Sequence, residues 1–169
     1  MSTPDPVAAA NHAQSRQVFM QRIYLKDASL EMPNGARAFT KEMAPQIEVQ
    51  VGTSVEALEP SAGLFQVVLQ VTITAKHGEE TAFLVEVHQA GIFQLVNFSA
   101  DAEIQGVLGA YCPNVLLPFA REAVASFVQR TGFPPVLLQP INFDAIYAEH
   151  LARSQGQAAD GSAPAQTVQ

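Results

Sequence analysis

The sequence is poor in cysteine, tryptophan and charged residues. Among 169 residues there is one cysteine, Cys112, and no tryptophan. A single cysteine cannot form an internal disulfide, so the fold does not require an oxidising compartment. Only 15% of the residues are charged, compared with about 25% in an average soluble protein. Much of the surface must therefore be uncharged or apolar.

Long apolar runs are also missing, although 48% of the residues are hydrophobic. No stretch approaches the ~20 apolar residues that a membrane-spanning helix needs. The first residues lack the basic and apolar regions of a secretion signal, and Pro4 and Pro6 interrupt them. We therefore expect a cytoplasmic protein with a packed core and no direct membrane insertion.

Basic residues are few. Nine Lys and Arg stand against sixteen Asp and Glu, which gives a net charge of −7 and a pI near 4.9. This balance argues against nucleic acid or an anionic membrane as the main partner. Residues 42–103 hold nine of the acids and one base, so they alone carry −8. This region either attracts a basic partner or is an ordinary solvated surface.

Catalytic motifs are absent from the sequence. It contains no nucleophile elbow, phosphate-binding loop, dinucleotide fingerprint or His-Glu-x-x-His pair. Glu86 and His88 lie two residues apart, which places them on one strand face, but without a third ligand they favour an exposed polar pair over a metal site. Cys112 has no nearby base and is expected to be a buried apolar thiol. We predict no enzymatic activity, no cofactor and no metal.

Four segments have the pattern of strands, at residues 18–31, 47–51, 65–73 and 81–87, and the pattern of the last can be extended toward residue 93. The third alternates apolar and polar residues most regularly. Turn signals at residues 32–35 and 76–79 separate the strands. Short connections between consecutive strands predict an antiparallel meander with one apolar face to be covered.

Helical patterns follow the strands. Ser99 is the expected N-cap of a helix with Asp101 and Glu103 in its first turn, and Pro113 is expected to end that helix and start another. The apolar stripe predicted for this second helix has i, i+3, i+4 spacing: Leu116, Phe119, Ala120, Ala123, Val124, Phe127 and Val128.

The C-terminal half is predicted to end in an extended segment and a last helix. Thr131-Gly132 should end the second helix, and the prolines at 134, 135 and 140 favour an extended connection. Asn142 is the expected cap of a last helix, one side of which carries Phe143, Ile146, Tyr147, His150 and Leu151. Strands first and helices afterwards indicate an α+β fold. We divide the chain into a flexible arm (1–17), one domain (18–153) and a disordered tail (154–169).

Three stretches together resemble the SecB family of bacterial protein-export chaperones. The first is QRIYLKD at 21–27 with EMPN at 31–34, and the second is GEETAFLVEV at 78–87 with GIF at 91–93. The third is LGAYCPN at 108–114, which continues to PFARE at 118–122, FP at 133–134 and PINFD at 140–144. The resemblance covers nearly the whole predicted domain, in order and at compatible spacing.

The resemblance implies an ATP-independent holdase that binds unfolded precursor proteins and delivers them to the SecA translocation motor. It also implies a four-stranded antiparallel sheet with a long helix and a C-terminal helix packed on one side. Protomers of this kind assemble as a dimer of dimers, a homotetramer in which the long helix lies at an interface.

The family's motor-binding surface is an acidic sheet face. The matching positions are Asp27, Glu31, Leu84 and Glu86. Strand alternation supports this independently, because Asp27 and Glu31 lie four residues apart on one strand and Leu84 and Glu86 two apart on another.

The family's client-binding surface is an apolar groove beside the sheet. The matching positions come from the second strand, the extended connection and the last helix: Ile47, Val49, Val51, Val136, Leu138, Phe143, Tyr147 and Leu151. Two other classes remain open at this point, an enzyme with a polar pocket and an oligomeric scaffold or binding module without activity toward unfolded clients.

Overall fold

The computed structural model describes residues 15–42 and 44–160, with side chains described as far as Ser154. Most of the predicted N-terminal arm, residues 1–14, and the end of the predicted tail, residues 161–169, lie outside the described residues. None of the helices in the described part is long and apolar enough to span a membrane.

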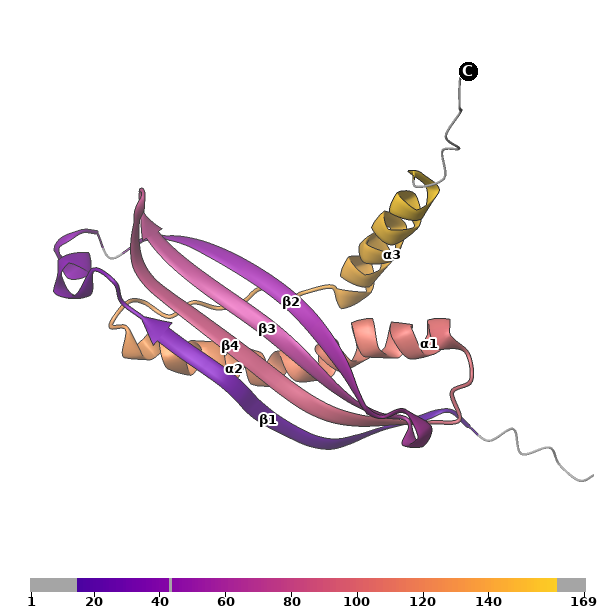
Figure 1. Ribbon diagram of the computed structural model, residues 1–169. Coiled ribbons are helices and arrows are strands. Elements are labelled where there is room, and N and C mark those ends of the chain that lie inside the picture. The colour runs from indigo at the N-terminus through magenta and orange to yellow at the C-terminus, as the bar shows by residue number, and fades with distance from the viewer. Residues whose placement is uncertain (1–14, 43, 161–169) are drawn as a thin grey trace, which may run out of the picture.

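Four antiparallel strands form one sheet (Figure 1). They are β1 (Gln17–Glu31), β2 (Gln46–Glu59), β3 (Leu64–His77) and β4 (Glu80–Val96). The four predicted strands are confirmed, but β2 and β4 run further than predicted. Gly78 joins β3 to β4 with a φ of +62°, a conformation that glycine adopts without a steric penalty.

The predicted meander is wrong. The strand order is β1-β4-β3-β2, so β1 pairs with β4 rather than with its neighbour in sequence. The connection between β1 and β2 includes a 3-10 helix, η1 (Gly35–Thr40), whose Ala38 is buried in the core. This connection is too long for a hairpin and leads the chain to the opposite edge of the sheet, which gives a Greek-key order.

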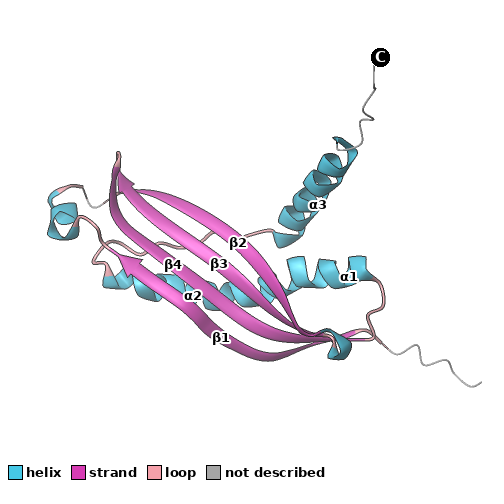
Figure 2. Cartoon of the chain, in the orientation of Figure 1, coloured by secondary structure: helices cyan, strands magenta, loops and turns pink. Residues whose placement is uncertain are grey.

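A continuous helical run covers one face of the sheet (Figure 2). It consists of α1 (Asp101–Gly106), a π-helical segment, η3 (Val107–Tyr111), and α2 (Cys112–Arg130). Ala100 rather than Ser99 is the N-cap residue, and it makes no side-chain cap. The prediction that Ser99 caps this helix is therefore wrong, and so is the prediction that Pro113 ends it.

Pro113 is tolerated because the helix widens immediately before it. The Cys112 N–H donates to the Val107 carbonyl five residues back, the π-helical pattern. Proline lacks an N–H, and a local shift of the hydrogen-bond pattern accommodates a residue that cannot continue the α-helical one. The helix therefore continues through this position.

The core lies between α2 and the two central strands. Leu116, Ala120, Val124 and Val128 are fully buried against β3 and β4, as the predicted stripe requires. Phe119 does not fit the predicted stripe, because 45% of its surface is exposed.

The last helix follows an extended connection. Gly132 has a φ of +80° and ends α2, and residues 133–142 then run without regular structure. The Asn142 Oδ1 accepts from the Ala145 N–H at 3.0 Å, which confirms the predicted cap of α3 (Phe143–Asp160). The helix therefore continues past Ser154, where we place the start of the tail.

Candidate functional site

The sheet face that no helix covers brings the four predicted motor-binding residues together. On β4, Phe83, Val85 and Val87 are fully buried on the helix side, whereas Leu84 and Glu86 are half-buried and point to the uncovered side. Residues directly opposite each other in an antiparallel pair share a face. Glu31 lies opposite Leu84 and Ser29 opposite Glu86.

Asp27 lies on the same face by strand alternation, because the register between β1 and β4 is continuous from Asp27 to Glu31. The register with β4 shifts between Leu25 and Asp27, and Asp27 then lies opposite His88. We call the surface formed by Asp27, Glu31, Leu84 and Glu86 the acidic face. Glu31 lies opposite the aliphatic side chain of Leu84, and Glu86 follows it two residues along β4, an arrangement that suits a basic and partly apolar partner.

The charges of the acidic face are only partly compensated. The Glu86 Oε1 lies 2.6 Å from the His88 Nε2 on the same strand, and the two side chains are 42% and 22% exposed. On the neighbouring strands, Lys76 pairs with Glu48 at 3.0 Å. Within the described part of the chain, Asp27 and Glu31 form no ion pair shorter than 4.0 Å. These two carboxylates are available to a partner.

On the helix side, the edge strand β2 exposes apolar residues that α2 does not cover. Ile47, Val49, Val51 and Val55 lie opposite residues of β3 that belong to the buried core. Between 38% and 47% of the surface of Ile47, Val49 and Val55 is exposed nonetheless. We call the surface between β2, the connection 133–142 and α3 the apolar groove.

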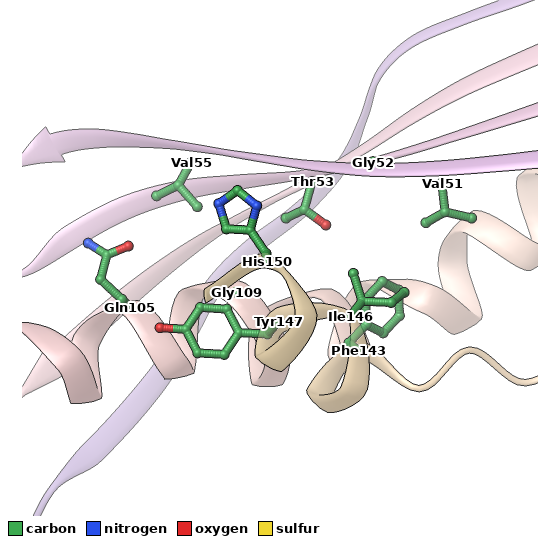
Figure 3. Close-up of a pocket in the computed structure, with 10 residues that line it drawn as sticks. All are labelled: Val51, Gly52, Thr53, Val55, Gln105, Gly109, Phe143, Ile146, Tyr147 and His150. Atoms are coloured by element: carbon green, nitrogen blue, oxygen red, sulfur yellow. The ribbon is translucent and has the colours of Figure 1, made fainter. Parts of the chain in front are cut away.

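A cavity of about 270 Å³ lies at the α3 end of the groove (Figure 3). Figure 3 shows Val51, Thr53 and Val55 projecting from β2 toward α3, which supplies Phe143, Ile146, Tyr147 and His150. Gly109 lets α3 come this close, because a Cβ at that position would lie 2.5 Å from the Tyr147 Cδ2.

A second pocket of about 180 Å³ lies at the other end of the groove, lined by Pro45, Ile47, Pro134 and Val136 among others. Phe133 forms its aromatic wall. The Phe133 ring centroid lies 5.3 Å from that of Phe39 and 5.4 Å from that of Phe83. Rigid aromatic and proline surfaces of this kind accept apolar side chains with little loss of conformational entropy.

The predicted groove residues do not all line the groove in the same way. Val51, Phe143 and Tyr147 line the first pocket, and Ile47 and Val136 line the second. Leu138 is buried, and its carbonyl accepts a 3.1 Å hydrogen bond from the Arg121 Nε. Val49 and Leu151 are exposed but line neither pocket.

The groove residues that sequence reasoning missed include Val55, Ile146, His150 and Pro134. The sequence pattern could have identified Val55, because this residue continues the alternation of Val49 and Val51 beyond the predicted end of the second strand. Ile146 and His150 were assigned to the apolar side of the last helix, but not to the groove.

Cys112 is buried as predicted. Burial raises the pKa of its thiol to about 12, so it stays protonated and unreactive at neutral pH. Among the described residues, no three or more His, Cys, Asp or Glu side chains are grouped as metal ligands. Glu86 and His88 remain a polar pair on the acidic face.

The fold and the two surfaces define an α+β protein built for binding, with a charged sheet face on one side and an apolar groove on the other. Residues 11–154 match the family model described as preprotein translocase subunit SecB. The chain belongs to the SecB family, which confirms the resemblance in the sequence.

Curated relatives agree with this assignment. The protein-export protein SecB of Methylococcus capsulatus is 48% identical over 148 residues, which cover 88% of this chain and 94% of that protein. The protein-export protein SecB of Thioalkalivibrio sulfidiphilus is 44% identical over 98% of both chains.

A solved structure shares the fold. It is a SecB-like chaperone from Mycobacterium tuberculosis in complex with a peptide from the HigA1 antitoxin. The TM-score is 0.59 at 14% identity, over 74% of this chain and 88% of that one. The comparison confirms the predicted α+β architecture with its four-stranded antiparallel sheet.

Proposed function

We propose that this protein is an ATP-independent holdase chaperone of the cytoplasm. It binds unfolded precursor proteins in the apolar groove, keeps them competent for translocation and delivers them to the SecA motor of the Sec export pathway. It acts by binding and release, without a catalysed reaction or a cofactor. The observation that carries the proposal is an exposed apolar groove in a chain of the SecB family.

The groove supports loose selectivity for clients. Burying a Val, Leu, Ile or Phe side chain completely contributes about 1.5–3 kcal/mol, and this contribution does not depend on direction. Two pockets joined by the exposed Val49 let an extended segment place several apolar side chains at once. Unfolded chains expose such segments and folded proteins do not.

The acidic face supports a separate contact with the motor. Asp27, Glu31 and Glu86 attract a basic segment, and Leu84 offers it apolar contact. The face lies on the side of the sheet opposite to the groove, so the protein can hold a client and bind SecA at the same time.

Assembly into a homotetramer, as a dimer of dimers, is part of the proposal. Tyr111 and Phe119 are 52% and 45% exposed on the helical layer. Large aromatic side chains exposed on one small domain favour burial between symmetric copies. The long helix α2 then contributes to an interface as well as to the core.

The test compares a reduced, unfolded precursor with the same protein in its native form. The chaperone and each form are mixed and analysed by size-exclusion chromatography. We expect a complex with the unfolded form alone. Binding to both forms, or to neither, contradicts the chaperone proposal. Binding to neither, by a protein that nevertheless assembles, favours the alternative of an oligomeric scaffold or binding module.

A further inference from the structure

His88 lies inside the acidic face and contacts one of its carboxylates. Its Nε2 is 2.6 Å from the Glu86 Oε1. From β1, Asp27 is directly opposite, with Lys26 beside it in sequence. From β3, the uncharged Gln70 is directly opposite. Carboxylates therefore approach the imidazole from its own strand and from β1.

Histidine is the side chain whose ordinary pKa places its charge change between pH 5 and 8. His88 is partly exposed, so it exchanges protons with solvent. When neutral, it hydrogen-bonds to Glu86 and leaves Asp27, Glu31 and Glu86 with their full charge. When protonated, it forms an ion pair with Glu86 and removes one of three formal negative charges.

We propose that His88 makes the contact of the acidic face with a basic partner depend on pH. In the neutral form, the charge of Glu86 is not compensated by His88 and can attract the cationic groups of SecA. The protonated form engages Glu86 itself and weakens that contact. The inference rests on the proposed docking of SecA to the acidic face.

The test measures SecA affinity of the whole protein at about pH 8 and about pH 5.5, on the two sides of an ordinary histidine pKa. His88→Gln keeps a hydrogen-bonding side chain but cannot be charged, and His88→Lys carries a permanent positive charge. His77→Gln is the matched control, since it removes another histidine of the β3–β4 hairpin that packs near Phe133 on the covered side. Because all variants are compared at the same pH, titration of SecA cancels in the ratios.

We expect the ratio of wild-type to His88→Gln affinity to fall about threefold to fivefold from about pH 8 to about pH 5.5, the upper part of the range that exposed charge pairs support. His88→Lys should bind weakly at both, and His77→Gln should follow the wild type. A constant ratio between wild type and His88→Gln overturns the role of His88 and leaves the docking proposal intact. Absence of SecA binding by the wild type at about pH 8 overturns the docking proposal and this inference with it.

Discussion

Reversing the charge of Glu86 should separate delivery of clients from holding them. Glu86 lies on the uncovered face, opposite Ser29 on β1 and Thr72 on β3. Glu86→Lys replaces a carboxylate beside Asp27 and Glu31 with an ammonium group and changes the charge of the acidic face by two. Charge pairs at protein interfaces have coupling energies of about 1.5 kcal/mol or more. We therefore expect SecA affinity to fall at least about tenfold, with slower association.

The fold should tolerate this substitution. The Glu86 side chain is 42% exposed, and its close polar partner is His88. Surface substitutions of this kind change stability by no more than about 0.5 kcal/mol. The introduced ammonium group also has acidic neighbours, which offset the lost contact with His88. Native mass and protection of an aggregating client should match the wild type.

The assay is SecA binding at low and high salt, with two controls. Glu86→Gln removes the charge without reversing it and should have a smaller effect. Glu59→Lys makes the same change in net charge at the far end of β2, where Glu59 lies opposite Leu64, and should leave binding near the wild-type level. Salt should weaken the wild-type contact, because exposed charges are screened over about 10 Å at 0.1 M. If Glu86→Lys binds SecA as tightly as the wild type at low salt, the docking site is on another surface.

Three further predictions concern assembly, the groove and the core. Light scattering should give a native mass about four times 18.1 kDa, and a stable monomer at micromolar concentration would contradict this. Replacing Val49 and Tyr147 with charged residues should reduce client protection while leaving native mass and SecA binding unchanged; full protection would remove both residues from the site. Because the pKa of Cys112 is raised to about 12 in the folded protein, the stability it contributes is complete below about pH 8.5, its unfolded value. Above that pH the wild type should lose up to about 1.4 kcal/mol per pH unit relative to Cys112→Ala in urea unfolding, and equal pH dependence of the two proteins would refute the burial argument.

Properties set by local patterns were predicted from the sequence. The alternation along 65–73 and 81–87 placed Leu84 and Glu86 on one face, because the side-chain period of a strand is fixed at two residues. Asn142 and Gly132 were assigned correctly for similar reasons, since a cap and a left-handed turn depend on the residue at one position. The strand alternation alone indicated which face of the sheet is acidic.

Properties set by distant parts of the chain were not predicted. The predicted meander order was wrong because the pairing of β1 depends on which edge of the sheet is free, and its partner β4 lies far from it in the sequence. The sequence predicts a helix break at Pro113 because proline is strongly unfavourable inside an ordinary α-helix, but a π-helical segment accommodates it. Phe119 has the spacing of a core residue and is exposed, because helical spacing alone does not show how wide a stripe the sheet can cover.

The two proposed surfaces are encoded in the same strands by alternate residues. On β2, Glu48 faces the uncovered side through its position opposite Thr74, whereas Val49 faces the groove through its position opposite Ile73. A shift of register by one residue would exchange the two sets. The buried side chains of β3 and β4 fix that register from the helix side. The packing of α2 against the sheet therefore keeps the acidic face charged and the groove apolar, and a substitution that loosened this packing would weaken both contacts together. Loss of one contact alone, as expected for Glu86→Lys or for charged residues at Val49 and Tyr147, is then evidence for a local effect rather than a general loss of structure.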